Sequence, residues 1–171
     1  MTACMRTFTL QNGRTKVPAK TIVYKNKAKF DKSLLNDIDT GVVYEKFNKQ
    51  YNVLQRLLDS PIGTGVYGAY RFYLDGRFNL FFIRSDEPLN PNDFNPEYNG
   101  SRGVYYLKGN TVRYDLFAPS NGLGWIGKST GNFTFSGDTL YVNDDDISRR
   151  GVEIYIKRKL PPEYFKHKAD W

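Results

Sequence analysis

The chain has few of the residues on which catalysis usually depends. Its 171 residues include one histidine, His167, and one cysteine, Cys4. A single cysteine excludes an internal disulfide and a zinc site built on several cysteines. The lone histidine lies near the chain end, which leaves no Ser–His or Cys–His arrangement within the body of the chain. No apolar run approaches the ~20 residues that a membrane-spanning helix needs. We therefore expect a non-enzymatic protein without a cofactor, soluble or tethered by something other than a transmembrane segment.

Positive charge is unevenly distributed along the chain. The formal net charge is +7, but the basic residues concentrate in residues 14–32 and 157–168. The body between them, residues 33–156, has slightly more acidic than basic side chains. Basic end segments more often solvate a chain or contact an anionic surface than read a nucleic acid. The charge pattern therefore makes a nucleic acid an unlikely partner.

A run of three aspartates, Asp144 to Asp146, is the densest group of acidic side chains. Oxygen ligands spaced this closely can hold Ca²⁺, but the glycine and the terminal glutamate of an EF-hand loop are missing. Two arginines, Arg149 and Arg150, follow within four residues. We interpret the run as a solvated turn capped by local ion pairs, and we expect no metal site.

Aromatic residues and turn pairs predict the fold class. Aromatics make up 16% of the chain, which favours strands. Alternating apolar and polar residues flank three turn pairs, Asp75-Gly76, Gly109-Asn110 and Gly137-Asp138, and each pattern is typical of a β-hairpin. About seven or eight strands follow one another without a helix-length segment between them, so a βαβ fold is unlikely. An all-β, antiparallel up-and-down β-barrel leaves no open edge and is the favoured architecture, with a β-sandwich as the alternative.

The same alternation assigns side chains to the barrel interior. Because successive strand residues point to opposite faces, every second apolar residue is expected to point inward. The residues assigned inward are Phe72, Leu74, Phe78, Leu80, Phe82, Val112, Tyr114, Leu116, Phe133, Phe135, Val152, Ile154 and Ile156. Burial of Phe135 predicts that Phe135→Ala costs about 3–5 kcal/mol of stability.

Three segments of different character make up the chain. Residues 1–32 read as a basic leader or stalk, with short strands at 6–11 and 21–25. Residues 33–160 form the barrel domain and begin with a turn of helix at 33–39. Within them, residues 44–62 fit both strand and helical spacing, so their fold stays open. Residues 161–171 form a C-terminal tail.

Four stretches together resemble a bacterial lipocalin-like lipoprotein. They read "NDIDTGVVYEK", "YRFYLDGRFNLFF", "GVYYLKGNTVRYDLF" and "GNFTFSGDTLYV", and they span most of residues 37–160. Gly41 and Tyr44 stand where a first barrel strand opens with Gly-x-aromatic. The lipocalin Gly-x-Trp signature and the long helix after the barrel are absent. "MTAC" resembles a lipobox, which implies that Cys4 is lipidated and that the protein belongs to the cell envelope, in the periplasm or anchored to the outer membrane. A free thiol at Cys4 is the alternative.

The resemblance implies that the protein binds a small apolar ligand or a protein partner of the envelope. In a carrier, the proline-rich loop 85–101 and the loop of Trp125 would ring the barrel mouth, with aromatic side chains below them. The ligand-binding residues expected on this basis are Tyr70, Phe82, Phe94, Tyr98, Tyr106, Tyr114 and Trp125.

Two alternatives stay open. The chain could be an accessory subunit of an envelope assembly, with a filled barrel and contacts through loops 85–101 and 119–129. It could also be a single-stranded nucleic-acid binder that stacks bases on Tyr and Phe side chains. An interior cavity of roughly 300 Å³ or more would favour ligand binding, whereas a solid interior would favour contacts with a protein.

Overall fold

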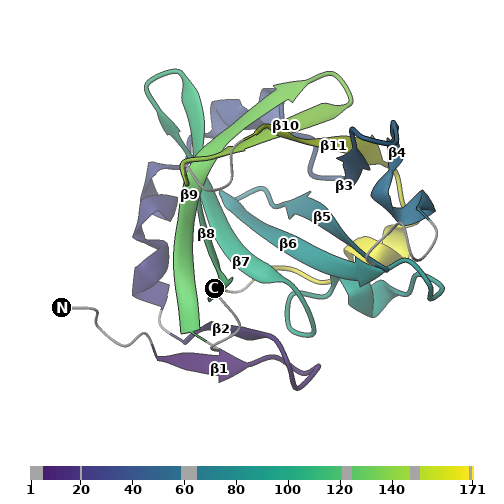
Figure 1. Cartoon of the computed structure of the whole chain (residues 1–171). Coiled ribbons are helices and arrows are strands. Elements are labelled where there is room, and N and C mark those ends of the chain that lie inside the picture. Colours follow the sequence, from purple (N-terminus) through teal and green to yellow (C-terminus); the bar gives the residue numbers. More distant parts are fainter. Residues whose placement is uncertain (1–5, 20, 59–64, 121–124, 147–150, 170) are drawn as a thin grey trace.

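A computed structural model describes residues 6–19, 21–58, 65–120, 125–146, 151–169 and 171. Eight antiparallel strands close into an up-and-down barrel, and pairing of the last strand with the first completes the ring. In order they are β3 (Val43–Asn48), β5 (Val66–Phe72), β6 (Arg77–Arg84), β7 (Ser101–Lys108), β8 (Thr111–Ser120), β9 (Trp125–Ser136), β10 (Thr139–Asp144) and β11 (Glu153–Arg158). The predicted lipocalin-like barrel is confirmed, and the sandwich is not formed (Figure 1).

The three predicted hairpin turns lie where the sequence places them. Lys108 pairs with Thr111 and Ser136 pairs with Thr139, so each of these turns has two residues. Gly109 and Gly137 have φ values of 60° and 57°, a region that favours glycine. In the third turn, the Tyr73 amide donates to the Arg77 carbonyl at 2.9 Å. These turns mark one end of the barrel, which we call the turn end. Strands β6 and β8 finish at the opposite end, which we call the open end.

Residues 30–38, from the N-terminal part of the chain, close the turn end. The helix η1 (Thr21–Lys29) is followed by η2 (Lys32–Asn36), which confirms the helical turn predicted at 33–39. Leu34 and Ile38 are buried in the same cluster as the barrel interior. The Phe30 ring packs on the turn at Gly76, where an added Cβ would lie 2.7 Å from the Cβ of Phe30. The apolar residues of this segment therefore act as a plug.

Aromatic rings fill the middle of the barrel. Phe133 is at the centre, with ring centroids 4.5 Å from Tyr114 and 5.2 Å from both Phe72 and Phe78. The buried rings of this cluster are Tyr44, Tyr70, Phe72, Phe78, Tyr105, Tyr114, Phe133 and Tyr155. Such ring pairs contribute about 0.5–1.5 kcal/mol each beyond the burial of area. Because these rings pack against one another, the barrel has a solid centre.

Six of the 13 predicted inward residues are buried, and β11 presents the face opposite to the one expected. Tyr155 is 2% exposed and belongs to the core cluster, whereas Ile154 and Ile156 point outward and are partly exposed. The reason is pairing register, because Leu140 lies opposite Tyr155 and a shift of one residue exchanges the two faces. Val152 precedes the strand and is 40% exposed.

One further inward assignment fails near a turn. Leu74 is 66% exposed because it lies in the turn after β5 and no longer follows the alternation of the strand. Phe135 points inward as predicted and packs on the core rings, but it is only partly buried because it lies at the end of β9 next to the Gly137 turn. We therefore expect Phe135→Ala to cost less than the ~3–5 kcal/mol of a fully buried ring.

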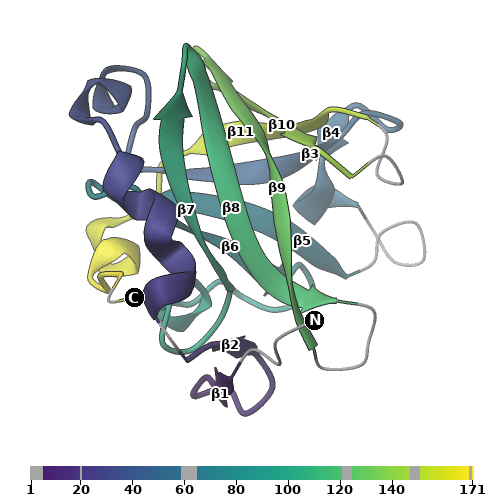
Figure 2. The ribbon, with the colours of Figure 1, turned by 90° about the vertical axis from the view of Figure 1, so that its left-hand side faces the viewer.

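The segments assigned to a leader and a tail pack against the outer wall. The hairpin of β1 (Thr7–Thr9) and β2 (Lys16–Pro18) lies below the barrel in Figure 1, and Figure 2 shows η1 across the outer face of β7. The predicted strand at 21–25 is wrong, because a helical conformation lets Tyr24 pack on Phe117 at 5.0 Å. Trp171 is also buried there. Tertiary packing therefore overrides the strand propensity of the β-branched residues in 21–25.

The region that the sequence left open continues the first barrel strand. After β3 the chain turns at Asn52, which has a φ of 55°. It then forms the short strand β4 (Val53–Leu54), paired with β3, and the helical turn η3 (Gln55–Leu57). Among the helices that the structure describes, none has the length and hydropathy to cross a bilayer.

We expect Phe133→Ala to lower the free energy of unfolding by about 3–5 kcal/mol, because it opens a cavity among fixed aromatic rings. Phe135→Ala should cost clearly less, and Leu74→Ala, at an exposed position, should change stability little. Urea denaturation followed by circular dichroism measures all three. Equal losses for Phe133→Ala and Phe135→Ala would contradict the packing described.

Candidate functional site

The open end of the barrel contains a hollow of about 540 Å³. It forms because the strands separate there. Pairing between β3 and β5 is limited to two residue pairs, and pairing between β6 and β7 stops at Leu80 and Ser101 while β6 continues to Arg84. The described lining consists of Lys46, Gln55, Val66, Tyr67, Gly68, Leu80, Phe82, Glu153 and Tyr155. The inward-facing side chains among these residues therefore line an open hollow.

One wall of the hollow is apolar. Phe82 continues the inward alternation of Phe78 and Leu80, yet it is 51% exposed because it lies beyond the pairing with β7. Gly68, opposite Phe82 in the register, carries no side chain and leaves space between Leu80 and Tyr155. An exposed phenylalanine beside a glycine provides a surface on which an apolar group can pack.

The floor of the hollow is polar. The Tyr155 hydroxyl donates to Glu153 Oε2 at 2.8 Å, and the Lys46 ammonium pairs with the same carboxylate. The ammonium also lies 5.6 Å from the centroid of the Tyr155 ring. Below this group, Tyr155 packs edge-to-face on Tyr70 at 4.8 Å. Tyr155 thus separates the hollow from the filled centre.

Burial keeps the tyrosines of the floor and the core protonated. Desolvation raises the pKa of Tyr70 and of Tyr155 well above the ordinary value, and the Glu153 charge raises that of Tyr155 further. Burial likewise raises the pKa of Tyr44 to about 12. At neutral pH the Tyr155 hydroxyl is therefore a hydrogen-bond donor and not a base. The hollow offers hydrogen bonds and apolar surface.

Some of the predicted ligand-binding residues lie inside the barrel, but they are not together. Tyr70 and Tyr114 are buried in the filled centre, 3% and 2% exposed, where they have no access to the hollow. Phe82 lies at the hollow itself. Trp125 begins β9, opposite Ser120, but its side chain lies outside the described residues, as does Cys4.

The other predicted residues lie on the outer wall. Phe94 is fully buried on η4 (Pro91–Phe94), where its ring packs 5.5 Å from Phe81, because the proline-rich loop folds over the outer face of β6. Tyr98, in the same loop, is 38% exposed and lines a separate polar hollow of about 500 Å³ with Phe82. The position expected for Phe94 is therefore wrong.

The inward position expected for Tyr106 is also wrong. Tyr106 faces outward, because Gly103 of the same strand lies on the inner face. An added Cβ on Gly103 would lie 2.3 Å from the Phe78 ring, so Gly103 is on the inner face and the alternation of β7 turns Tyr106 outward. There its hydroxyl hydrogen-bonds to Asp115 at 3.3 Å, beneath η1, and Lys29 lies over its ring.

Sequence reasoning missed the polar half of the site. Lys46, Glu153 and Tyr155 come from strands far apart in the chain, and only the pairing of Tyr155 with Lys46 brings them together. The sequence contains a weak signal. Glu153 lies two positions before Tyr155 at the start of a strand, and residues two apart in a strand lie on one face. Nothing in the sequence alone reveals that this face is the inner one.

The aspartate run is held by protein partners. Asp145 pairs with Arg113 and accepts a hydrogen bond from Thr130 Oγ1 at 2.7 Å, and the Asp146 amide donates to Asp144 Oδ1 at 2.9 Å. The ion pair lowers the pKa of Asp145. Within the described part of the chain, no group of three His, Cys, Asp or Glu side chains is arranged to hold a metal ion.

Comparisons of this chain with protein-family models, with curated proteins and with solved structures found no significant match.

We expect the most deeply buried tyrosines to ionise only when the barrel unfolds. Burial raises the pKa values of Tyr44 and Tyr67 to about 12, which holds both side chains protonated in the folded state. Because the folded pKa exceeds the unfolded one, this stabilisation is complete below about pH 10 and is lost as the pH rises towards about 12. Phenolate absorbance should therefore rise together with unfolding as the pH approaches about 12.

The alkaline titration is followed by absorbance and circular dichroism on the same samples. If all 13 tyrosines ionised in one step near pH 10 while the fold stayed intact, the buried tyrosine cluster would be refuted.

Proposed function

We propose that the protein is a non-enzymatic binding protein whose open end takes a small, mainly apolar ligand. The observation that carries the proposal is the hollow of about 540 Å³ beneath the half-exposed Phe82 ring. Its volume lies within the range of ~300–1,000 Å³ that is usual for small-molecule sites. Because the centre of the barrel is filled, the ligand would bind at the mouth and not in a deep interior.

The lining indicates a neutral ligand with one polar group. Val66, Leu80 and Phe82 supply apolar surface, which contributes about 25 cal/mol for each Å² buried. At the floor, Lys46 and Glu153 neutralise each other, so the site has little net charge with which to attract an ion. The remaining donor capacity of the Lys46 ammonium suits a hydroxyl or carbonyl group on the ligand.

A protein partner is the second candidate, and the solid barrel centre is the observation that favours it. A filled interior leaves the loops and the outer wall as the surfaces available for function. Tyr98, 38% exposed in the loop between β6 and β7, is the aromatic side chain best placed to contact a partner there. A location in the cell envelope and a lipid anchor at Cys4 are part of this proposal, on the resemblance to a lipobox alone.

A neutral fluorophore, N-phenylnaphthylamine, tests the ligand proposal. We expect saturable fluorescence enhancement with the wild type and an affinity at least about five-fold lower for Phe82→Ala, since removing the ring takes away apolar contact. Gly68→Leu should abolish binding, because the new side chain enters the space between Leu80 and Tyr155.

Tyr141→Ala is the matched control, because Tyr141 is 36% exposed on the outer face of β10. It should bind the fluorophore as the wild type does. Binding that is not saturable, or that is the same in Phe82→Ala and Gly68→Leu as in the wild type, would defeat the ligand proposal and leave the protein partner. Circular dichroism of each variant checks that the fold is retained.

A further inference from the structure

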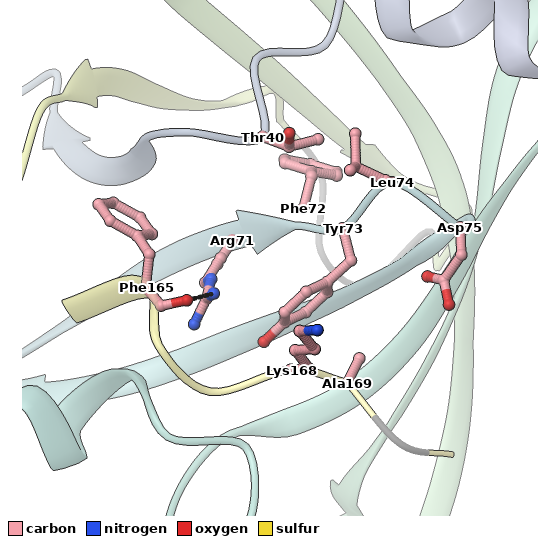
Figure 3. A pocket seen from close by; sticks show the side chains of 9 residues that line it. All are labelled: Thr40, Arg71, Phe72, Tyr73, Leu74, Asp75, Phe165, Lys168 and Ala169. Atoms are coloured by element: carbon pink, nitrogen blue, oxygen red, sulfur yellow. Dashed lines mark hydrogen bonds between the residues drawn. The ribbon is translucent and has the colours of Figure 1, made fainter. Parts of the chain in front are cut away.

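A second cavity lies on the outer wall at the turn end, where the C-terminal segment passes over β5 (Figure 3). This segment contains the helical turn η6 (Pro162–Phe165) and continues to Trp171. The cavity has a volume of about 400 Å³. Its lining includes the apolar side chains of Leu74, Phe165 and Ala169. It is separate from the hollow at the open end, because Leu74 belongs to the turn between β5 and β6.

A buried arginine without an acidic partner lines this cavity. Arg71 is 5% exposed, and its two terminal nitrogens donate to the carbonyls of Phe94 at 3.2 Å and Phe165 at 2.8 Å. Its Nε has no hydrogen-bond partner, and no carboxylate of the described residues is within ion-pair distance. The guanidinium lies between the rings of Tyr73, at 4.8 Å, and Phe165, at 5.2 Å.

A buried cation in this setting is unusual in energetic terms. Removing a charge from water is costly unless a counter-charge compensates it, and neutral carbonyls and aromatic faces compensate only in part. Burial lowers the pKa of Arg71, which expresses the same penalty. By contrast Glu45, a buried acidic residue on the outer wall, has two arginine partners, Arg56 and Arg158. The positive charge of Arg71 is therefore not neutralised by an acidic side chain, and a bound anion could neutralise it.

The other charges around the cavity add to the positive field near Arg71. Lys168, an exposed residue of the C-terminal segment, lines the cavity on the same side. The one acidic residue in the lining, Asp75, lies at the far side from Arg71 in Figure 3 and pairs with Arg77 at 3.1 Å and Lys27 at 3.7 Å. An anion that entered beside Lys168 would contact the cations Lys168 and Arg71, and the acid Asp75 is already paired with other basic residues.

We propose that this cavity binds a small organic anion with an apolar body, such as a carboxylate or a sulfonate. The anionic group lies against the guanidinium of Arg71 and the ammonium of Lys168, and the apolar body packs on Leu74 and Phe165. The exposed positions of Lys168 and Leu74, 66% exposed, provide the entrance. This site is independent of the neutral ligand at the open end.

Anilinonaphthalene sulfonate is the probe, because it is N-phenylnaphthylamine with one sulfonate added. We expect it to bind the wild type saturably and to bind Lys168→Glu about five-fold more weakly, with weakening at high salt. Lys166→Glu is the matched control: it makes the same charge change at an exposed position two residues away that does not line the cavity, and it should bind as the wild type does. Arg71→Gln should lower the affinity at least about ten-fold.

Because Arg71→Gln also removes two hydrogen bonds to backbone carbonyls, Lys168→Glu keeps the test valid if that variant unfolds. N-phenylnaphthylamine should bind Lys168→Glu and the wild type alike, which separates this site from the one at Phe82. The proposal is overturned if Lys168→Glu and Lys166→Glu bind the sulfonate equally. It is also overturned if Phe82→Ala, and not Lys168→Glu, weakens sulfonate binding.

Discussion

The packing of aromatic rings around Phe133 determines what the rest of the barrel can do. Rings from several strands meet there, including Tyr70, Tyr114 and Phe72, and they leave the centre solid. An eight-stranded barrel is just wide enough to be filled or to hold one small ligand, and here the filled solution is realised at mid-height. Binding is therefore confined to the ends and to the outer wall.

Tyrosines lie at both ends of this core, and their hydroxyls connect it to polar groups. At the turn end, Tyr105 donates to the Tyr73 carbonyl at 2.6 Å. At the open end, Tyr155 donates to Glu153, which places a carboxylate and its lysine partner directly above the core. The polar floor of the hollow is thus a consequence of the way in which the aromatic core ends.

Arginines on the outer wall connect the barrel to the C-terminal segment. Arg71 and Arg77 donate to carbonyls of the C-terminal segment, at Phe165 and Ala169, and Arg77 also lies 5.9 Å from the Trp171 ring. These contacts hold the described part of the C-terminal segment on the barrel, with the second cavity beneath it. The anion site we propose follows from an arginine that binds the segment through neutral groups only.

The barrel and its turns could be predicted because they depend on local signals, namely alternation and glycines suited to positive φ at positions such as Gly109 and Gly137. The face of β11 could not, because isoleucines alternate there with a tyrosine and only the pairing with Leu140 decides which set is buried.

The sites could be predicted only in part, because they too depend on the pairing register. Phe82 was predictable from its strand, whereas Lys46, Glu153 and Arg71 read as surface charges in the sequence and acquire their roles only through register and burial.

An NMR titration tests the confinement of the neutral ligand most directly. Resonances of the full chain are followed while N-phenylnaphthylamine is added to saturation. The solid core predicts chemical-shift changes centred on Gly68, Leu80, Phe82 and Tyr155, with Phe133 and Leu140 unaffected. Shift changes centred on Phe133 and Leu140 would show that a ligand enters the interior, and they would contradict the account.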